Sequence, residues 1–191
     1  IEKNPKLTLA FMARGQVFRQ QGQYAQAADD FKRATALEPR NFGAFYNLGL
    51  MYQYLQRFGE AVDAYQRAVE IHPLDPDVNM NLAVVYAQMG HPLRGLPYAQ
   101  RAIIGGAESP HTHANLGTLY ASMGETDKAI AELRKAIELN ANAPEVYLNL
   151  AAEYMKQDQW EVAGNVLRGA AKLGPNVAVQ ERLGLTYYKT G

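Results

Sequence analysis

The chain has 191 residues, of which 48% are hydrophobic, so it is long enough to bury a substantial core. Its 19 Lys and Arg balance its 19 Asp and Glu, and it has no cysteine; this argues against nonspecific binding to nucleic acid or an anionic membrane, and excludes a disulfide framework and a thiolate metal site. Because no apolar run reaches the ~20 residues that cross a bilayer, we expect a soluble protein without membrane insertion, with a cytoplasmic location slightly favoured.

The sequence repeats itself every 34 residues. Counted from Thr8, the complete units are residues 8–41, 42–75, 76–109, 110–143 and 144–176. Residues 1–7 resemble the tail of a preceding unit, and residues 177–191 supply the first half of a further one. Since such units bury their faces only against neighbours, we expect residues 1–191 to form a single array that is a fragment of a longer one. Its uncapped ends could self-associate.

Each unit pairs large with small residues. Its first half has an aromatic residue, at Phe18, Tyr52, Tyr86, Tyr120 and Tyr154. Close to these rings stand the small residues Gly15, Gly49, Ala83, Gly117 and Ala151. The second half places small residues seven apart, with larger apolar ones between them at Phe31, Tyr65, Leu133 and Leu167. This spacing is typical of an amphipathic helix, and glycines in the middle and prolines at the ends predict helix, tight turn, helix.

The second unit carries the pattern Leu48-Gly49, Tyr52, Ala61, Tyr65, Ala68 and Pro73. It resembles the tetratricopeptide repeat, and five successive matches make this resemblance specific. The resemblance implies an all-α, right-handed superhelical solenoid of antiparallel helix pairs, with five full repeats plus partial repeats at both ends. It also implies that first helices line a concave groove and second helices face outward.

The third unit departs most from the pattern. Gly95 and Ala99 replace larger or helix-favouring residues, and Pro97 lies inside the expected second helix. Because an internal proline removes a backbone hydrogen bond and clashes with the preceding turn, we predict a kink between Pro92 and Gly105. In the first unit, Arg14 stands where the others have leucine.

Asparagine recurs at the sixth position of four successive units, as Asn47, Asn81, Asn115 and Asn149. Asparagine is a poor helix former, so its repeated use indicates a function. A carboxamide can bond both the N–H and the C=O of an extended peptide. Helices roughly 10 Å apart and a peptide rise of about 3.3 Å give one asparagine per three peptide residues. The ladder resembles the one in the repeats of the O-GlcNAc transferase, where asparagines hold substrate polypeptides.

Side chains beside the asparagines predict a mildly apolar groove around the second and third units. They are Tyr46, Leu50, Tyr54, Met80, Val84 and Gln88. A structural alternative stays open, in which the asparagines bond neighbouring helices and the rings pack on one another. A clamp for a peptide carboxylate, known in other tetratricopeptide proteins, is disfavoured because the second, third and fourth units offer no basic groove residue.

No catalytic or metal site is predicted. His111 and His113 are two apart on an expected helix, so they cannot form the i, i+4 pair of a helical zinc site, and we expect both at the surface. No phosphate loop or nucleophile motif is visible. We therefore predict a non-catalytic scaffold, without cofactor, that binds another protein as an extended peptide. The alternatives are the substrate-recruiting arm of a larger enzyme, such as a glycosyltransferase, and an assembly module that oligomerises.

Overall fold

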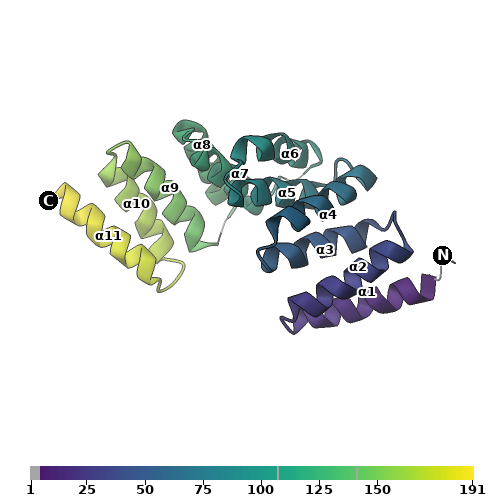
Figure 1. The fold of residues 1–191 in the computed structure, drawn as a ribbon. Coiled ribbons are helices and arrows are strands. Elements are labelled where there is room, and N and C mark those ends of the chain that lie inside the picture. The colour runs from purple at the N-terminus through teal and green to yellow at the C-terminus, as the bar shows by residue number, and fades with distance from the viewer. Residues whose placement is uncertain (1–4, 107, 141) are drawn as a thin grey trace. The chain divides into compact units, whose positions relative to one another are not determined.

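A computed structural model describes residues 5–106, 108–140 and 142–191, and these form α-helices joined by short turns (Figure 1). The helices are α1 (Pro5–Gln20), α2 (Tyr24–Leu37), α3 (Phe42–Tyr54), α4 (Phe58–Ile71), α5 (Pro76–Gln88), α6 (Pro92–Ile104), α7 (Pro110–Ser122), α8 (Thr126–Glu138), α9 (Pro144–Lys156), α10 (Trp160–Ala171) and α11 (Val177–Thr190). The described residues contain no strand. The predicted all-α fold of helix pairs is confirmed.

The chain divides into two compact units, Ile1–Ala107 with α1 to α6 and Glu108–Gly191 with α7 to α11. Inside each unit, every helix packs against the helix that follows it. The continuous array over residues 1–191 stays a prediction.

The first helix of most pairs begins at a side-chain cap. Asn41, Asp75 and Ser109 are 34 residues apart, and the side-chain oxygen of each accepts a hydrogen bond from the backbone N–H three residues later, at 2.9–3.1 Å. Such a cap satisfies a donor that the helix itself leaves unpaired. Asn176 caps α11 in the same way, whereas Ala143 precedes α9 without a side-chain acceptor.

The turn inside each pair is closed by one recurring backbone hydrogen bond. The N–H just before the second helix donates to the carbonyl of the aromatic residue, as from Gln23 to Phe18 and from Arg57 to Tyr52, at 2.9 and 2.8 Å. This is the long bond of a helix terminus that contains a left-handed residue. Gly22 supplies that residue in the first repeat, with a φ of 72°, but Gln56 and Asp158 adopt it in the second and fifth, each with a φ of 58°.

The core is an interlock of large and small side chains. Phe31, Tyr65, Leu133 and Leu167 are fully buried at one position of the second helices. The facing first helices carry glycine or alanine: an added β-carbon on Gly49 would lie 2.6 Å from the ring of Tyr65. In the third repeat both positions are small, Ala83 and Ala99, and α6 approaches so closely that a β-carbon on Gly95 would lie 2.6 Å from the Ala83 carbonyl oxygen.

One detail differs from what the sequence suggests. Residues 5–7, which the repeat period assigns to the tail of an earlier unit, are the first residues of α1; proline is compatible with this position because the first N–H of a helix has no partner anyway. The remainder of that predicted tail, residues 1–4, lies outside the described residues. Pro97 lies inside α6, as predicted, and the helix continues to Ile104; the kink stays a prediction.

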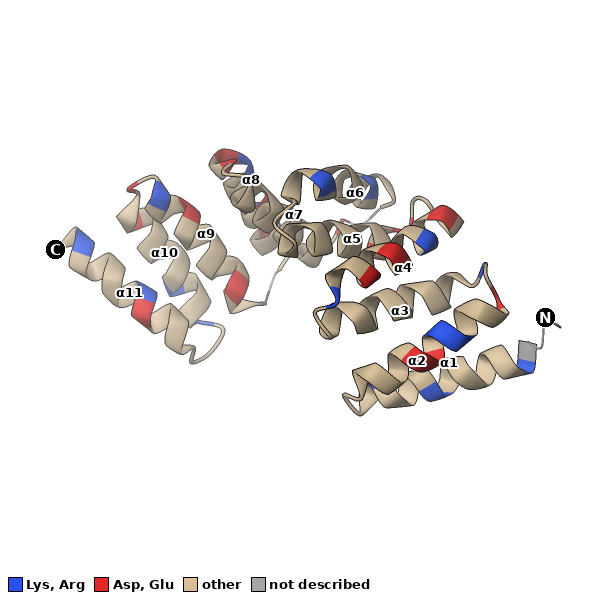
Figure 2. Ribbon diagram, viewed as in Figure 1, with Lys and Arg blue, Asp and Glu red and all other residues tan. Residues whose placement is uncertain are grey.

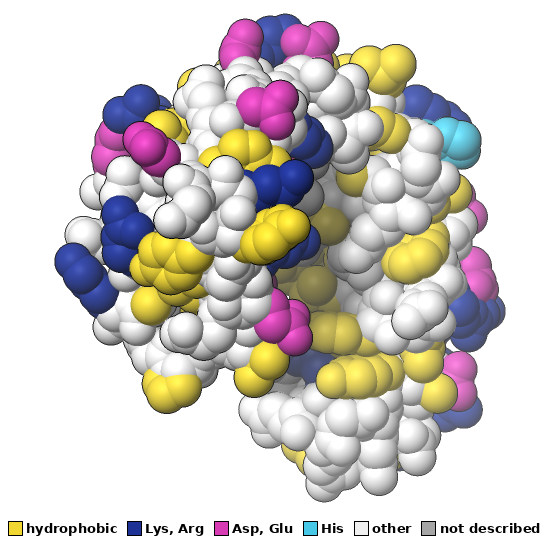
Figure 3. All heavy atoms as spheres, turned by 90° about the vertical axis from the view of Figure 1, so that its left-hand side faces the viewer, with side chains coloured by type: hydrophobic (Ala, Val, Ile, Leu, Met, Phe, Trp, Pro, Cys, Tyr) yellow, Lys and Arg dark blue, Asp and Glu magenta, His cyan; other side chains and the backbone are white. Residues whose placement is uncertain are grey.

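Charged residues of both signs are interspersed along the helices (Figure 2). On the face in Figure 3, Lys and Arg lie beside Asp and Glu, with hydrophobic groups scattered among them. In the described part of the chain, no helix is long and apolar enough to cross a membrane.

Candidate functional site

The four predicted asparagines occupy the sixth position of α3, α5, α7 and α9. The side-chain N–H of each one donates a hydrogen bond to a partner in the same compact unit. Asn47 bonds the Gly43 carbonyl at 2.7 Å, and Asn115 bonds the imidazole Nε2 of His111 at 3.1 Å. Both partners belong to the asparagine's own helix.

The other two asparagines bridge to the preceding repeat. Asn81 donates to the Tyr46 hydroxyl at 3.3 Å, and Asn149 donates to the Thr118 hydroxyl at 3.2 Å. A role in fixing repeat geometry therefore has support at Asn81 and Asn149, and lacks it at the two that bond within their own helix.

None of the four side-chain oxygens accepts a hydrogen bond from the described residues. A primary carboxamide has two N–H groups and an oxygen with two lone pairs. One N–H orients each amide, so the second N–H and the oxygen stay free. This is the complement that one residue of extended backbone requires.

The first compact unit contains a pocket of about 420 Å³ beside this row, formed by α3, α5, the turn before α4 and the start of α4. Its lining includes four residues that the sequence predicts, Leu50, Tyr54, Asn81 and Gln88, and three that it does not, Gln53, Gln56 and Phe58. The lining combines four carboxamides with three apolar side chains and contains no charged group. It suits an uncharged peptide segment.

A chain of hydrogen bonds holds the pocket wall in place. The hydroxyl of Tyr65, which is fully buried, donates to Gln53 Oε1 at 3.0 Å, and Gln53 Nε2 donates to Gln88 Oε1 at 3.1 Å. The chain joins the core residue on α4 to side chains on α3 and α5. Binding groups that are already ordered lose less conformational entropy when a ligand arrives.

Tyr54 forms an aromatic wall of the pocket. Its ring stacks on Tyr24 with centroids 4.6 Å apart and planes at 10°, yet 59% of the residue stays exposed. A tyrosine fixed on one face offers a large, partly apolar surface on the other.

Of the remaining predicted groove residues, Tyr46 is half-buried and stacks on Phe42 with centroids 6.0 Å apart. Burial raises the pKa of Tyr46, so its hydroxyl stays neutral, and the hydroxyl oxygen accepts from Asn81. Val84 is half-buried, and Met80 is only 5% exposed. Met80 therefore contributes to packing and offers no surface to a ligand.

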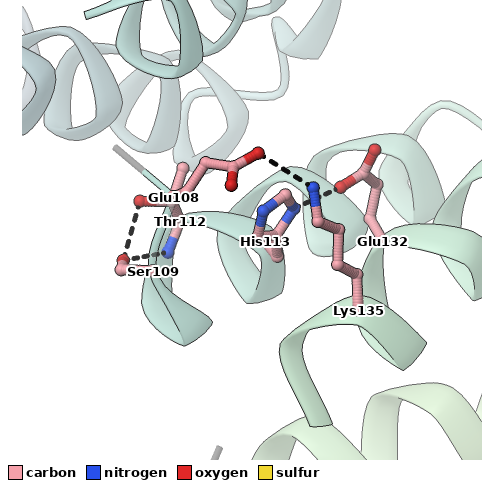
Figure 4. Close-up of polar contacts among 6 residues, drawn as sticks. All are labelled: Glu108, Ser109, Thr112, His113, Glu132 and Lys135. Carbon is pink, nitrogen blue, oxygen red and sulfur yellow. Dashed lines mark hydrogen bonds and ion pairs between the residues drawn. The ribbon is translucent and has the colours of Figure 1, made fainter. Parts of the chain in front are cut away.

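The second unit contains a buried polar cluster that corrects one prediction. His111 is exposed, as predicted, but His113 is only 2% exposed, and Figure 4 shows its imidazole beside Glu132. Its Nδ1 lies 2.6 Å from Glu132 Oε2, and its buried Nε2 has no partner among the described residues. His113 occupies the position of Phe11, Phe45 and Tyr147, which are half-buried, and of Asn79, which is fully buried, so the repeat register, rather than the residue type, indicates its burial.

We expect Glu132→Ala to destabilise the second unit by about 1–3 kcal/mol, because it leaves a buried imidazole nitrogen without its partner. The measurement is urea unfolding followed by circular dichroism. Glu138→Ala, on the same helix but exposed, is the control and should stay within about 0.5 kcal/mol. Replacing both partners, as His113→Phe with Glu132→Leu, should recover stability, since no buried polar group is then left alone. Equal effects of the two alanine variants would refute this role for the pair.

The described residues contain no group of three or more His, Asp or Glu that could hold a metal ion. The candidate peptide-binding features of the first helices are the amide row and the uncharged pocket.

Comparisons with known proteins place the chain in a family. A tetratricopeptide repeat model matches residues 12–76 and 51–111, and a second model, described as a TPR repeat, matches residues 117–158. No curated protein matches the sequence.

Similar solved structures include YrrB, described as a TPR protein with an unusual peptide-binding site, at 21% identity over 94% of this chain and 92% of that one, with a TM-score of 0.73. A MamA protein is 21% identical over 89% of this chain and 93% of its own, with a TM-score of 0.78. TTC0263, a thermophilic TPR protein of Thermus thermophilus, is 23% identical over 95% of this chain and 99% of its own, with a TM-score of 0.72.

Proposed function

The chain belongs to the tetratricopeptide repeat family, and we propose that it is a non-catalytic scaffold that binds an extended segment of another protein along its first helices. Repeat solenoids use such helix rows as binding surfaces.

The observation that carries the proposal is the set of free amide groups beside a preorganised pocket. In the first unit, Asn47 and Asn81 offer unpaired oxygens, and Asn81 also lines the uncharged pocket. Backbone contacts to the amides would hold the peptide without regard to its sequence. An apolar or aromatic side chain against Tyr54 and Phe58 would supply selectivity.

In the second unit, Asn115 and Asn149 offer the same groups. Each net hydrogen bond contributes roughly 0.5–1.5 kcal/mol, and ordering the peptide opposes binding. We therefore expect affinities on the order of micromolar.

The test is selection from a peptide library, followed by fluorescence anisotropy with the wild-type chain and an Asn81→Ala, Asn115→Ala double variant. The double variant should lose most of the affinity while its helicity stays intact. Each single variant then shows how much its own unit contributes. Gln26→Ala, which removes an exposed carboxamide from the second helix α2, is the control and should bind like wild type. If the double variant binds as tightly as wild type, the asparagines do not hold the peptide.

A further inference from the structure

Helix α6 differs from every other second helix in its charge. Its sequence, PLRGLPYAQRAII, contains Arg94 and Arg101 and no acidic residue. The other second helices, α2, α4, α8 and α10, each contain at least one Asp or Glu. Figure 2 shows basic but no acidic segments on α6.

The outward face of α6 is apolar. Leu93 and Ile104 are 74% and 72% exposed, and Pro97 between them is exposed as well. At 3.6 residues per turn, these three side chains lie within about 40° of one another around the helix. At the same three positions, the other repeats carry mainly charged, small or polar residues: Ala25, Asp29 and Ala36; Gly59, Asp63 and Glu70; Asp127, Ala131 and Glu138; and Glu161, Asn165 and Lys172.

Packing inside the unit does not account for this stripe. The buried face of α6 consists of Gly95, Ala99 and Ala102, which lie roughly opposite, about 140–240° around the helix from the stripe. Pro97 also removes one hydrogen bond from the helix backbone. Because proline has no N–H, the Leu93 carbonyl lacks its usual donor four residues on and can accept a hydrogen bond from elsewhere.

The two arginines flank the stripe on one side only, at about 80–100° around the helix from Leu93. Arg94 lies over the ring of Tyr86 at 5.0 Å, and Arg101 lies over the ring of Tyr98 at 5.4 Å. Neither arginine forms an ion pair within the described residues. The rings orient both guanidinium groups, and their charges are free for a partner.

We propose that the outer face of α6 is a second docking site, which binds an amphipathic helix of a partner protein. The partner's apolar residues cover Leu93, Pro97 and Ile104, and acidic residues along one edge pair with Arg94 and Arg101. Charge complementarity selects this occupant, because α6 offers two unpaired cations and no acid. The stripe is about 16 Å long at 1.5 Å per residue, so three turns of a partner helix cover it. This site is independent of the peptide pocket on α3 and α5.

The probe is a synthetic stapled helix with leucines on one face and glutamates along one edge, and its comparison is the same peptide with lysines in place of the glutamates. Binding to the full chain is measured by anisotropy, and amide chemical shifts locate the contact. The acidic peptide should bind and shift the resonances of α6, and the lysine peptide should not bind.

Variants of exposed residues make the test specific. Leu93→Ser with Ile104→Ser should weaken binding about tenfold or more, as expected for central apolar contacts, whereas Val162→Ser, at an exposed position on α10, should have no effect. Arg94→Glu with Arg101→Glu should reverse the preference towards the lysine peptide. Thermal unfolding checks that each variant keeps its fold.

Failure of the acidic peptide to bind at millimolar concentration, or binding that the serine variant does not weaken, overturns the proposal. Two other occupants would also overturn it. One is a second copy, detected as a dimer in sedimentation that the serine variant abolishes. The other is a lipid surface, detected as binding to phosphatidylglycerol vesicles in preference to the peptide.

Discussion

Gly95→Ala is expected to destabilise the first unit by about 2–3 kcal/mol, although alanine is the residue that the other four repeats have at this position. The reason is the close approach of α6 to α5. An added β-carbon would lie 2.6 Å from the Ala83 carbonyl oxygen and 3.2 Å from the Ala83 Cα. Both atoms belong to the backbone, so one whole helix has to move.

Helix propensity acts in the opposite direction, but it is the smaller effect. Alanine in place of glycine stabilises a helix by about 0.5–1 kcal/mol. Gly59→Ala, at an open position of α4 where an added β-carbon meets nothing within 4 Å, isolates this gain and should raise the stability. Urea unfolding of the two variants therefore has opposite expected signs. Stabilisation by both substitutions would mean that α5 and α6 lie further apart than described.

Gly49→Ala is expected to cost about 2 kcal/mol through contact with a side chain. The added β-carbon would lie 2.6 Å from two atoms of the Tyr65 ring, which is fully buried. The ring, its hydrogen bond to Gln53 and the spacing of α3 and α4 all have to adjust. The loss is measured by chemical unfolding of the full chain.

A smaller partner should relieve this clash. The fifth repeat combines Ala151 with Leu167 in one buried cluster, so alanine and leucine fit together in the same fold. Gly49→Ala with Tyr65→Leu should therefore be more stable than the sum of the two single variants implies, by about 1 kcal/mol. Strict additivity of the two changes would show that the glycine and the ring do not interlock.

The repeat made most of the fold predictable from the sequence. Small residues seven apart, rings in the first halves and glycines in the turns together indicate helix pairs, because each of these features serves close helix packing. Arg14 departs visibly from the repeat pattern, which has leucine at this position, but the sequence alone does not show which residue Arg14 contacts. In the structure, Arg14 donates two hydrogen bonds to the buried carboxylate of Asp30, at 2.6 and 2.7 Å.

The candidate site was predictable in part. Register alone places Asn81, Leu50, Tyr54 and Gln88 on first helices, and the same register could have indicated Gln53, next to Tyr54. Gln56 and Phe58 belong to the turn and to the start of α4, where the period of the first helix carries no information. Met80 was assigned to the groove by register, and its burial could not be predicted because neighbouring elements decide it.

The hydroxyl of Tyr65 limits which residues can replace this tyrosine. Phenylalanine fills the core position in the first repeat as Phe31, and packing alone would let the two residues replace each other freely. In the second repeat the hydroxyl also fixes Gln53, and through it Gln88, in the pocket wall. Under the proposed function, Tyr65→Phe would therefore alter peptide recognition from a buried position that does not line the pocket, so this core position is constrained by more than packing.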